Sequence, residues 1–270
     1  MNKYQYPVVL SIAGSDSGGG AGIQADIKTI SALGCYGTTV ITAITAQNTL
    51  GVNSIYAIPS EIVNAQMTSV INDIPPSAIK VGMVYLRGSA EIIASILKQH
   101  GEIPVVFDPV MVSTSGTNLM NSDCLSIFKN LLFPLTTLLT PNLDEAALIT
   151  GMEVNNLADM HVAASRIIDL GCNAVLIKGG HLQGNDLYDV YRDRDGQQQV
   201  FKSKAIQSNN THGTGCTLSS AIASYLALGH DLTLAIEKGK DYVHHAIEHG
   251  KNIKIGKGIG PLNHFFSLLK

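Results

Sequence analysis

The chain has 270 residues, of which 45% are hydrophobic and 14% are charged, and its formal net charge is −3. A chain of this length and composition can bury a large core, so we expect a single globular domain over residues 1–270. There is no run of like charges and no apolar stretch of secretory or membrane-spanning length, so the sequence favours neither nucleic acid nor a membrane as a partner.

In chain order, the first elements are a buried strand, a glycine-rich loop and a helix. A short apolar run, five glycines and apolar residues at helical spacing predict them at 8–13, 14–22 and 23–33. The same alternation continues along most of the chain. We expect further strands at 38–46, 52–58, 79–81, 105–107, 138–140 and 174–177, and helices at 60–73, 89–99, 122–132, 143–150 and 159–170.

The alternation stops at 187–205, where two strand-like runs flank Asp193-Arg194-Asp195-Gly196, an Asp-Gly hairpin signal. An apolar helix at 217–228 and a last helix at 231–249 follow. Strands that alternate with helices predict an α/β fold in which a central, mostly parallel sheet has helices on both faces. The hairpin predicts a small antiparallel edge on that sheet.

Residues 209–216 lead directly into the apolar helix and contain Gly213, Thr214 and Gly215. The first backbone N–H groups of a helix have no partner within it and lie at the positive end of its dipole, so these residues predict an anion hole. Cys216 would lie in the first turn, where the dipole favours a thiolate. A tight glycine turn followed by a buried cysteine is the alternative, and the pattern alone leaves both open.

The glycines of the first loop also fit a dinucleotide-binding pattern, since Gly20-Ala21-Gly22-Ile23-Gln24-Ala25 matches Gly-x-Gly-x-x-Ala. Such a site needs an acidic residue at the end of the second strand to hold a ribose hydroxyl, and the chain has Ala46-Gln47 there. The sequence therefore disfavours NAD. It also lacks Gly-x-x-x-x-Gly-Lys-Ser/Thr, which excludes a P-loop nucleotide site by pattern.

Ligand-type side chains collect at the predicted carboxyl ends of several strands, where α/β sheets bind ligands. They are Asp16, Asp26, Gln47, Met83, Asp108, Asn142, Glu145 and Lys178. Each alone is more often a cap or turn residue, but together they indicate a site. Asp108 and Glu145 can jointly hold Mg²⁺, which proteins bind through one or two carboxylates plus substrate phosphates, and Lys178 can balance phosphate charge.

The four cysteines are widely spaced and include no Cys-x-x-Cys pair. We therefore expect neither a disulfide framework nor a structural zinc site, and a cytoplasmic location. His244, His245 and His249 lie along one predicted helix, and we expect a surface face there because no cysteine or carboxylate completes a metal-binding pattern. The sequence does not decide whether His212 does more than shape the anion loop.

A set of motifs spans nearly the whole chain: Ile12-Ala13-Gly14-Ser15-Asp16, Gly19-Gly20-Ala21-Gly22-Ile23-Gln24-Ala25-Asp26, Ala46-Gln47-Asn48-Thr49, Asp108-Pro109-Val110-Met111, Thr140-Pro141-Asn142-Leu143-Asp144-Glu145, Lys178-Gly179-Gly180-His181, residues 211–217 and Gly256-Lys257-Gly258-Ile259-Gly260-Pro261. With these motifs in this order, the chain resembles the ribokinase-like superfamily. Within it, the chain resembles the family of bacterial hydroxymethylpyrimidine/phosphomethylpyrimidine kinases of thiamine biosynthesis.

The resemblance implies one ribokinase-like kinase domain with ATP and Mg²⁺ as cofactors. Its reaction transfers the γ-phosphate of ATP to the hydroxymethyl group of 4-amino-5-hydroxymethyl-2-methylpyrimidine, and then a second phosphate to the monophosphate. Phosphoryl transfer depends mainly on positioning and charge stabilisation, which backbone donors, a metal ion and a lysine can supply. Relatives are commonly homodimers, so we expect a homodimer.

The resemblance also assigns roles to residues. The positions around the pyrimidine are Gly14, Asp26, Gln47, Met83 and Val110. The catalytic anion hole consists of Gly213, Thr214 and Gly215, and Cys216 takes the place of the catalytic aspartate found in much of the superfamily. Lys178 joins them as a catalytic residue. Asp108 and Glu145 match the metal positions, and Asn142, Lys178 and Thr211 lie on the ATP side.

The nearest alternative is a pyridoxal kinase of the same fold with the same cysteine. Gln47 distinguishes the two, because its amide can pair with both the ring nitrogen and the amino group of an aminopyrimidine, whereas pyridoxal presents a phenol and an aldehyde. A ligand sensor that kept the fold is a second alternative, and the intact Asp108, Glu145 and Lys178 disfavour it.

The loop 113–116 is expected to be a lid, without the lysine that some relatives have there.

Overall fold

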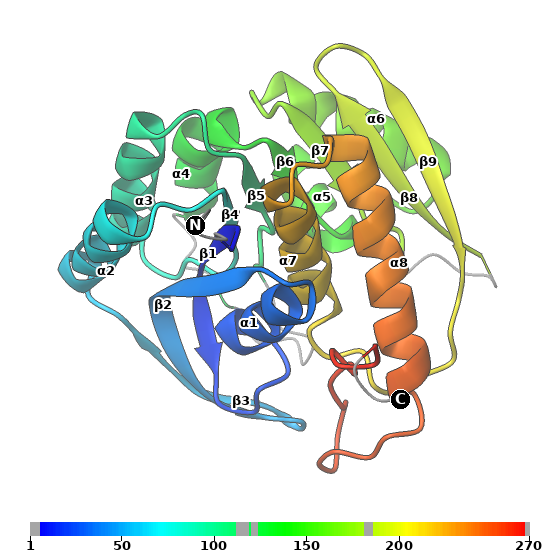
Figure 1. Cartoon of the computed structure of the whole chain (residues 1–270). Coiled ribbons are helices and arrows are strands. Elements are labelled where there is room, and N and C mark those ends of the chain that lie inside the picture. The colour runs from blue at the N-terminus through cyan, green and yellow to red at the C-terminus, as the bar shows by residue number, and fades with distance from the viewer. Residues whose placement is uncertain (1–5, 112–118, 120–123, 181–185, 268–270) are drawn as a thin grey trace, which may run out of the picture.

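The computed structural model describes residues 6–111, 119, 124–180 and 186–267, and in this part of the chain nine strands form one sheet (Figure 1). The strand order is β3-β2-β1-β4-β5-β6-β7-β8-β9. The strands are β1 (Val8–Asp16), β2 (Tyr36–Asn48), β3 (Gly51–Ala57), β4 (Ala78–Val81), β5 (Val105–Phe107), β6 (Leu138–Leu139), β7 (Ala174–Ile177), β8 (Asp186–Asp193) and β9 (Gln198–Lys204).

The centre of the sheet is parallel and both of its ends are antiparallel. Strands β2, β1, β4, β5, β6 and β7 run parallel, so the predicted central sheet is confirmed. The predicted hairpin is also confirmed, since β8 pairs antiparallel with β7 and with β9. At the opposite end, β3 pairs antiparallel with β2. The two residues between β2 and β3 can join only antiparallel strands, because a parallel pair needs a long crossover.

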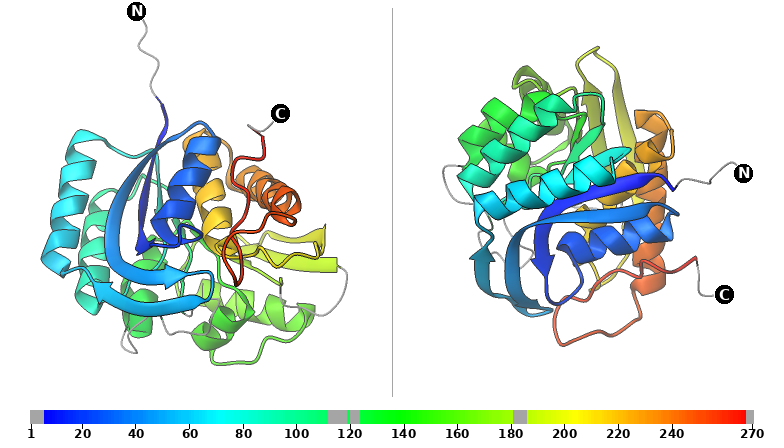
Figure 2. Two further views of the ribbon diagram at one scale, coloured as in Figure 1. Left: turned by 90° about the horizontal axis from the view of Figure 1, so that it is seen from below. Right: turned by 60° about the vertical axis from the view of Figure 1, so that its left-hand side comes forward.

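Helices cover both faces of the sheet (Figures 1 and 2). The helices α1 (Gly22–Ala32), α7 (Thr214–Ala227) and α8 (Leu232–Gly250) lie on one face. The helices on the other face are α2 (Ser60–Asp73), α3 (Arg87–Gln99), α4 (Cys124–Ile127), α5 (Leu143–Thr150) and α6 (Leu157–Asp169). Along β1, Leu10 and Ile12 face the second group and Val9 faces the first, and all three are fully buried. A strand buried on both faces explains the continuous apolar run that predicted it.

The predicted helix at 122–132 is wrong in detail. The described part begins with the short α4, continues as a π-helix over Phe128–Leu132 and ends as a 3₁₀ turn over Phe133–Leu135. Pro134 lies in this last turn, where a proline cannot continue an α-helix. Two other helices begin at capping side chains: Asn142 forms a capping box with Glu145 at the start of α5, and Asp231 caps α8.

No helix in the described residues is both long enough and apolar enough to cross a membrane.

Candidate functional site

A cavity of about 1370 Å³ opens at the carboxyl ends of the parallel strands, beside the amino end of α7. Its wall includes all but one of the residues that the sequence assigned to a site. These are Gly14, Gln47, Met83, Asp108, Val110, Asn142, Glu145, Lys178, Thr211, Gly213, Thr214, Gly215 and Cys216. Residues from seven separate stretches of the chain therefore meet in one place. This agrees with the rule that α/β sheets bind ligands at the carboxyl ends of their parallel strands.

The start of α7 presents free backbone donors to this cavity. Gly213 is the N-cap residue in the left-handed conformation, with φ 86°. The N–H of Thr214 bonds back to the carbonyl of Thr211 at 3.2 Å, but among the described residues no acceptor takes the N–H of Gly215 or Cys216. Two unpaired donors at the positive end of a helix form a site for an anion.

This loop packs directly on the glycine loop between β1 and α1. A Cβ atom at Gly213 would overlap the carbonyl oxygen of Gly20, and a Cβ atom at Gly20 would overlap the ring of His212. The positive φ of Gly213 adds strain to any larger residue there. Glycine at both positions therefore allows the two backbones to approach closely, which places the helix start against the end of β1.

The thiol of Cys216, the third residue of α7, lies in the cavity wall. Burial, together with the charges of Asp26 and Asp108, raises its pKa to about 11, although the charge of Lys80 and a hydrogen bond from the Gly22 N–H act in the opposite direction. The expectation of a thiolate is therefore wrong, because burial outweighs the charge of Lys80 and the hydrogen bond from Gly22. At neutral pH the sulfur carries its proton.

Beside Gly215 in the cavity wall, the Nζ of Lys178 lies 2.7 Å from Asp108 Oδ1. Burial opposes the charged lysine, but the carboxylates of Asp108 and Glu145 raise the pKa of Lys178. Burial and the nearby Asp108 together raise the pKa of Glu145 to about 7, although Lys178 acts in the opposite direction. One ammonium group thus faces two carboxylates, and this wall has surplus negative charge whenever both are ionised.

Asp26 is the predicted site residue that does not line the cavity. It is fully buried one layer below the wall, where Lys80 Nζ contacts both its oxygens at 2.9 and 2.8 Å. The hydroxyls of Ser220 and Ser11 donate to the same carboxylate at 2.7 and 2.5 Å. Lys80 lines the cavity in its place. Burial opposes the charged form of Lys80, but Asp26 raises the pKa of Lys80, so the lysine stays charged.

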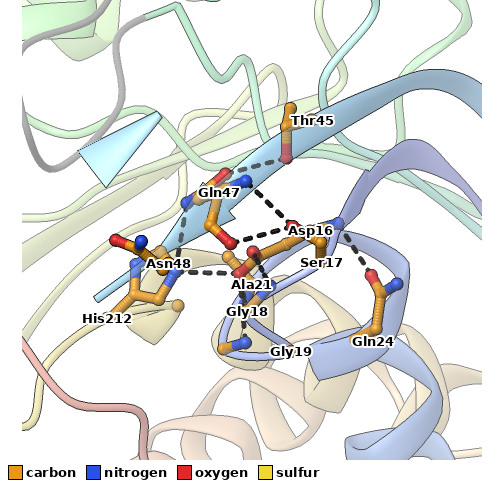
Figure 3. Close-up of polar contacts among 12 residues, drawn as sticks. Asp16, Ser17, Gly18, Gly19, Ala21, Gln24, Thr45, Gln47, Asn48 and His212 are labelled. Atoms are coloured by element: carbon orange, nitrogen blue, oxygen red, sulfur yellow. Dashed lines mark hydrogen bonds and ion pairs between the residues drawn. The ribbon is translucent and has the colours of Figure 1, made fainter. Parts of the chain in front are cut away.

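The remaining predicted residues form an apolar wall with one amide in it. Met83 and the partly buried Val110 pack together with Leu119. The ideal Cβ position at Gly14 lies 2.9 Å from the sulfur of Met83, so glycine leaves room for this side chain. Gln47, at the end of β2, turns its side-chain amide toward Thr45 and His212 (Figure 3). A flat ring can lie against this wall and reach the amide.

The first glycine loop is closed to ligands by its own carboxylate (Figure 3). Asp16 accepts from the N–H groups of Gly18, Gly20 and Ala21 at 2.8, 3.0 and 2.9 Å. Burial alone would raise the pKa of Asp16, but hydrogen bonds from His212 and from these backbone groups hold it below its ordinary value. The donors that would bind a pyrophosphate are thus occupied, in agreement with the exclusion of NAD.

Sequence reasoning missed a further, partly buried ion pair in the wall. Lys240 of α8 pairs with Asp189 of β8, whose other oxygen accepts from the Gly179 N–H at 2.9 Å. In the sequence, Lys240 is only a lysine on the apolar side of an amphipathic helix. Its partner cannot be predicted without knowing that β8 lies beside this helix. Lys80 gave a clearer signal, because a lysine within a four-residue buried strand requires a partner.

The histidines of α8 do not form a metal site. His245 and His249 stack on each other and on Phe266. Among the residues that the structure describes, no three or more His, Cys, Asp or Glu side chains are grouped to bind a metal ion. The expected lid at 113–116 and His181 of the Lys178 motif lie outside the described residues.

Comparison with known proteins identifies relatives over nearly the whole chain. The family model described as phosphomethylpyrimidine kinase matches residues 16–263. A hydroxymethylpyrimidine/phosphomethylpyrimidine kinase of Rhizobium meliloti (strain 1021) is 49% identical over 259 residues, which cover 96% of this chain and 97% of that protein.

Two solved structures are closely similar. The phosphomethylpyrimidine kinase of Clostridium difficile 630 is 44% identical with a TM-score of 0.79, over 89% of this chain and 99% of the other. The pyridoxal kinase of Bacillus subtilis, solved as an ADP complex, is 34% identical with a TM-score of 0.90, over 98% and 100%. The fold is thus the ribokinase-like one that the resemblance predicted.

Proposed function

Because the chain belongs to the phosphomethylpyrimidine kinase family, we propose that it phosphorylates 4-amino-5-hydroxymethyl-2-methylpyrimidine with ATP and then phosphorylates the monophosphate to the diphosphate, in thiamine biosynthesis. The observation that carries the proposal is the meeting of three groups in one cavity. The free N–H donors of Gly215 and Cys216 lie between the apolar wall with Gln47 and the charged wall with Lys178.

The cavity wall suggests where each part of the reaction occurs. The pyrimidine lies against Met83 and Val110, with its ring nitrogen and amino group on Gln47. Its hydroxymethyl oxygen then faces Cys216. That oxygen forms a bond to the γ-phosphorus while the bond to the β,γ-bridging oxygen breaks, and the electron pair of that bond leaves with ADP. The backbone donors at the start of α7 stabilise the charge on the transferred group.

Cys216 orients the acceptor hydroxyl in this scheme. A thiol whose pKa is raised to about 11 cannot serve as a general base at neutral pH, since it already carries its proton. Phosphoryl transfer through a loose transition state does not need a strong base, because the hydroxyl keeps its proton until late in the reaction and can then pass it to an oxygen of the transferred phosphate, from which it is lost to solvent. The sulfur accepts or donates a weak hydrogen bond and so fixes the direction of attack.

The charged wall fits Mg²⁺. Glu145 ionises with difficulty mainly because it is buried, and the neighbouring Asp108 adds to this effect. A cation bound between two such carboxylates would favour the ionised form of both. These two residues would hold the ion, which would supply charge neutralisation at the ATP phosphates. Lys178 adds a second positive charge beside them, and Asn142 and Thr211 complete the ATP side.

ADP release by the purified chain tests the proposal. With ATP, Mg²⁺ and the hydroxymethylpyrimidine, we expect two ADP for each pyrimidine consumed, and mass spectrometry should find the monophosphate before the diphosphate. No ADP above the background without pyrimidine would overturn the proposal, and release of a single ADP would limit the chain to the first step.

A pyridoxal kinase activity is the second candidate, because a pyridoxal kinase of Bacillus subtilis shares the fold with a TM-score of 0.90. We expect kcat/KM for pyridoxal to be at least about 10-fold below that for the aminopyrimidine, since pyridoxal leaves part of the Gln47 amide unpaired. A higher value for pyridoxal would reverse the assignment.

The homodimer and the cytoplasmic location stay predictions. Size-exclusion chromatography with light scattering tests the first, and cell fractionation tests the second.

A further inference from the structure

The amide of Gln47 lies between two polar partners in the cavity wall (Figure 3). Its Oε1 position is 3.0 Å from Thr45 Oγ1, and its Nε2 position is 3.3 Å from His212 Nε2. Oxygen and nitrogen of a side-chain amide have nearly the same shape, so the direction of the group follows from its hydrogen-bond partners. The direction matters because this amide is the polar group on the apolar wall.

The hydrogen on His212 has a fixed place. Its Nε2 lies 2.9 Å from Asp16 Oδ2, which also accepts from the N–H groups of Gly20 and Ala21. Hydrogen bonds hold the pKa of Asp16 below its ordinary value, so the carboxylate is ionised and can only accept. The Nε2 of His212 must therefore carry a hydrogen and donate it toward Asp16.

This hydrogen determines which end of the Gln47 amide faces His212. An amide nitrogen there would set two donors against each other at 3.3 Å. At the other end, Thr45 has one hydroxyl hydrogen but two acceptors in reach, the carbonyl of Ser15 at 3.1 Å and the amide oxygen at 3.0 Å. Turning the amide by 180° resolves both conflicts. Nε2 then donates to Thr45, Thr45 donates to Ser15, and Oε1 lies beside the Nε2–H of His212, whose one hydrogen is shared between Asp16 at 2.9 Å and the amide oxygen at 3.3 Å.

The ring of His212 cannot leave this position easily. It packs on Gly20 so closely that a Cβ atom there would overlap it, and its side chain is only 12% exposed. The backbone N–H of His212 bonds to the carbonyl of Gly260 at 3.0 Å, which fixes the chain on the other side. The glycine loop, Asp16 and the C-terminal segment therefore hold the Nε2–H donor of His212 in place. This donor fixes the direction of the Gln47 amide.

We propose that His212 is a specificity-determining residue, which, held by Asp16, sets the direction of the Gln47 amide and so selects a 4-aminopyrimidine ring. The inference rests on the proposed function. One hydrogen of Nε2 is bonded to Thr45, and one lone pair of Oε1 faces His212. The second hydrogen of Nε2 and the second lone pair of Oε1 therefore face the ligand in one fixed order. A 4-aminopyrimidine matches that order with a ring nitrogen that accepts and an amine that donates. A 4-oxopyrimidine presents a ring N–H that donates and an oxygen that accepts, which is the reverse order.

The test compares the 4-amino substrate with its 4-oxo analogue. We expect the natural chain to prefer the amino ring by at least about 100-fold in kcat/KM, because the wrong order leaves two buried groups unpaired. In His212→Leu the amide is free to turn, so the preference should fall at least 10-fold, mainly through a higher KM for the amino ring. His212→Gln keeps a donor near Asp16 and should restore part of the preference.

Two further variants separate this role from a structural one. Ser17 exchanges two hydrogen bonds of 2.8 Å with the backbone of Gln47 and does not touch its amide. Ser17→Ala should therefore lower kcat/KM for both rings alike. In Gln47→Leu the preference is lost, and adding His212→Leu should change it no further. An unchanged preference in His212→Leu, with both rings affected equally, would overturn the proposal.

Binding measurements keep this proposal distinct from the proposed function. Calorimetry with 4-amino-2,5-dimethylpyrimidine and its 4-oxo counterpart needs no phosphoryl transfer, since neither ring has a hydroxymethyl group. If the natural chain binds the amino ring preferentially and His212→Leu does not, the role of His212 holds even where no ADP is released. If ADP is released normally and the binding preference is the same in both proteins, the role of His212 fails alone. Binding of neither ring overturns both.

Discussion

The two glycine-rich loops that meet at Gly20 and Gly213 differ in what their backbone donors do. In the first loop, the N–H groups of Gly18, Gly20 and Ala21 all bond to Asp16. In the second, the N–H of Gly215 has no acceptor among the described residues and faces the cavity. A glycine-rich turn before a helix is therefore an anion site only where the chain does not occupy it with its own carboxylate.

The acidic residues of the two regions differ in the same way. Asp16 has enough donors that its pKa lies below the ordinary value, whereas burial raises that of Glu145 to about 7. The first loop is a satisfied and stabilising structure. The second region, with its charged wall, keeps unsatisfied groups for the substrates, so changes there should affect activity more than stability.

Gly213→Ala should have the largest effect, because the added methyl group overlaps the Gly20 carbonyl and moves the helix start away from the phosphate. We expect kcat to fall by about 10³-fold, the upper range for loss of an oxyanion donor. Gly229→Ala is the matched control, since its φ is also 86° but no atom lies within 4 Å of the new Cβ. It should cost about 1 kcal/mol of stability and leave kcat within about twofold. Equal kcat in the two variants would contradict the role of the close contact.

Cys216→Ala should lower kcat by about 10²-fold and change KM by less than about threefold, because the hydroxyl loses its orienting partner while the ring keeps its wall. Cys35→Ala removes a buried thiol that does not line the cavity and should leave kcat unchanged. A kcat that rises with pH up to about 11 in the natural chain, and not in the variant, would show that the thiolate acts as a base after all.

Glu145→Gln should reduce activity and yet stabilise the chain at neutral pH in the absence of metal. Folding raises the pKa of Glu145 from 4.5 to about 7, so the folded state binds its proton more tightly and stability falls as pH rises between these values. The variant should lack this loss, which amounts to about 3 kcal/mol. Urea unfolding at pH 5 and pH 8 measures it. Glu91 lies on the exposed surface, so Glu91→Gln should have the same free energy of unfolding as the natural chain at both pH 5 and pH 8.

Asp16→Asn should have the smallest effect on turnover and a clear effect on stability. An asparagine oxygen cannot accept all the donors that Asp16 accepts, so we expect a loss of about 2 kcal/mol at pH 7. Because folding lowers the pKa of Asp16, its contribution is present above pH 3.8 and is lost as pH falls through the lowered value. The two proteins should therefore converge in acid. Asp231→Asn, which accepts a single N–H at the start of α8, should be nearly neutral.

The order of strands and helices could be predicted because most of the sheet is buried on both faces. Val9, Leu10 and Ile12 give a continuous apolar run, and the helices show their spacing clearly. The strand-end residues could be located for the same reason, since parallel strands end at one edge. The segment 122–132 failed because its apolar spacing does not reveal a π-helix before Pro134.

The layer behind the cavity wall could not be predicted. Asp26 and Lys80 lie 54 positions apart on α1 and β4, and only their packing shows that the lysine faces the cavity and the carboxylate supports it. The pKa of Cys216 was missed for a related reason. A helix dipole can be inferred from sequence, but the burial that opposes it depends on the walls around the sulfur.

The protonated state of Cys216 also has a consequence for the durability of the protein. Peroxides and alkylating reagents attack the thiolate far faster than the thiol, so a sulfur that holds its hydrogen at neutral pH is a slow target for oxidation to sulfenic acid. A carboxylate at this position would be immune to such damage. The raised pKa gives the chain much of that immunity while it keeps a neutral, weakly bonding group beside the substrate.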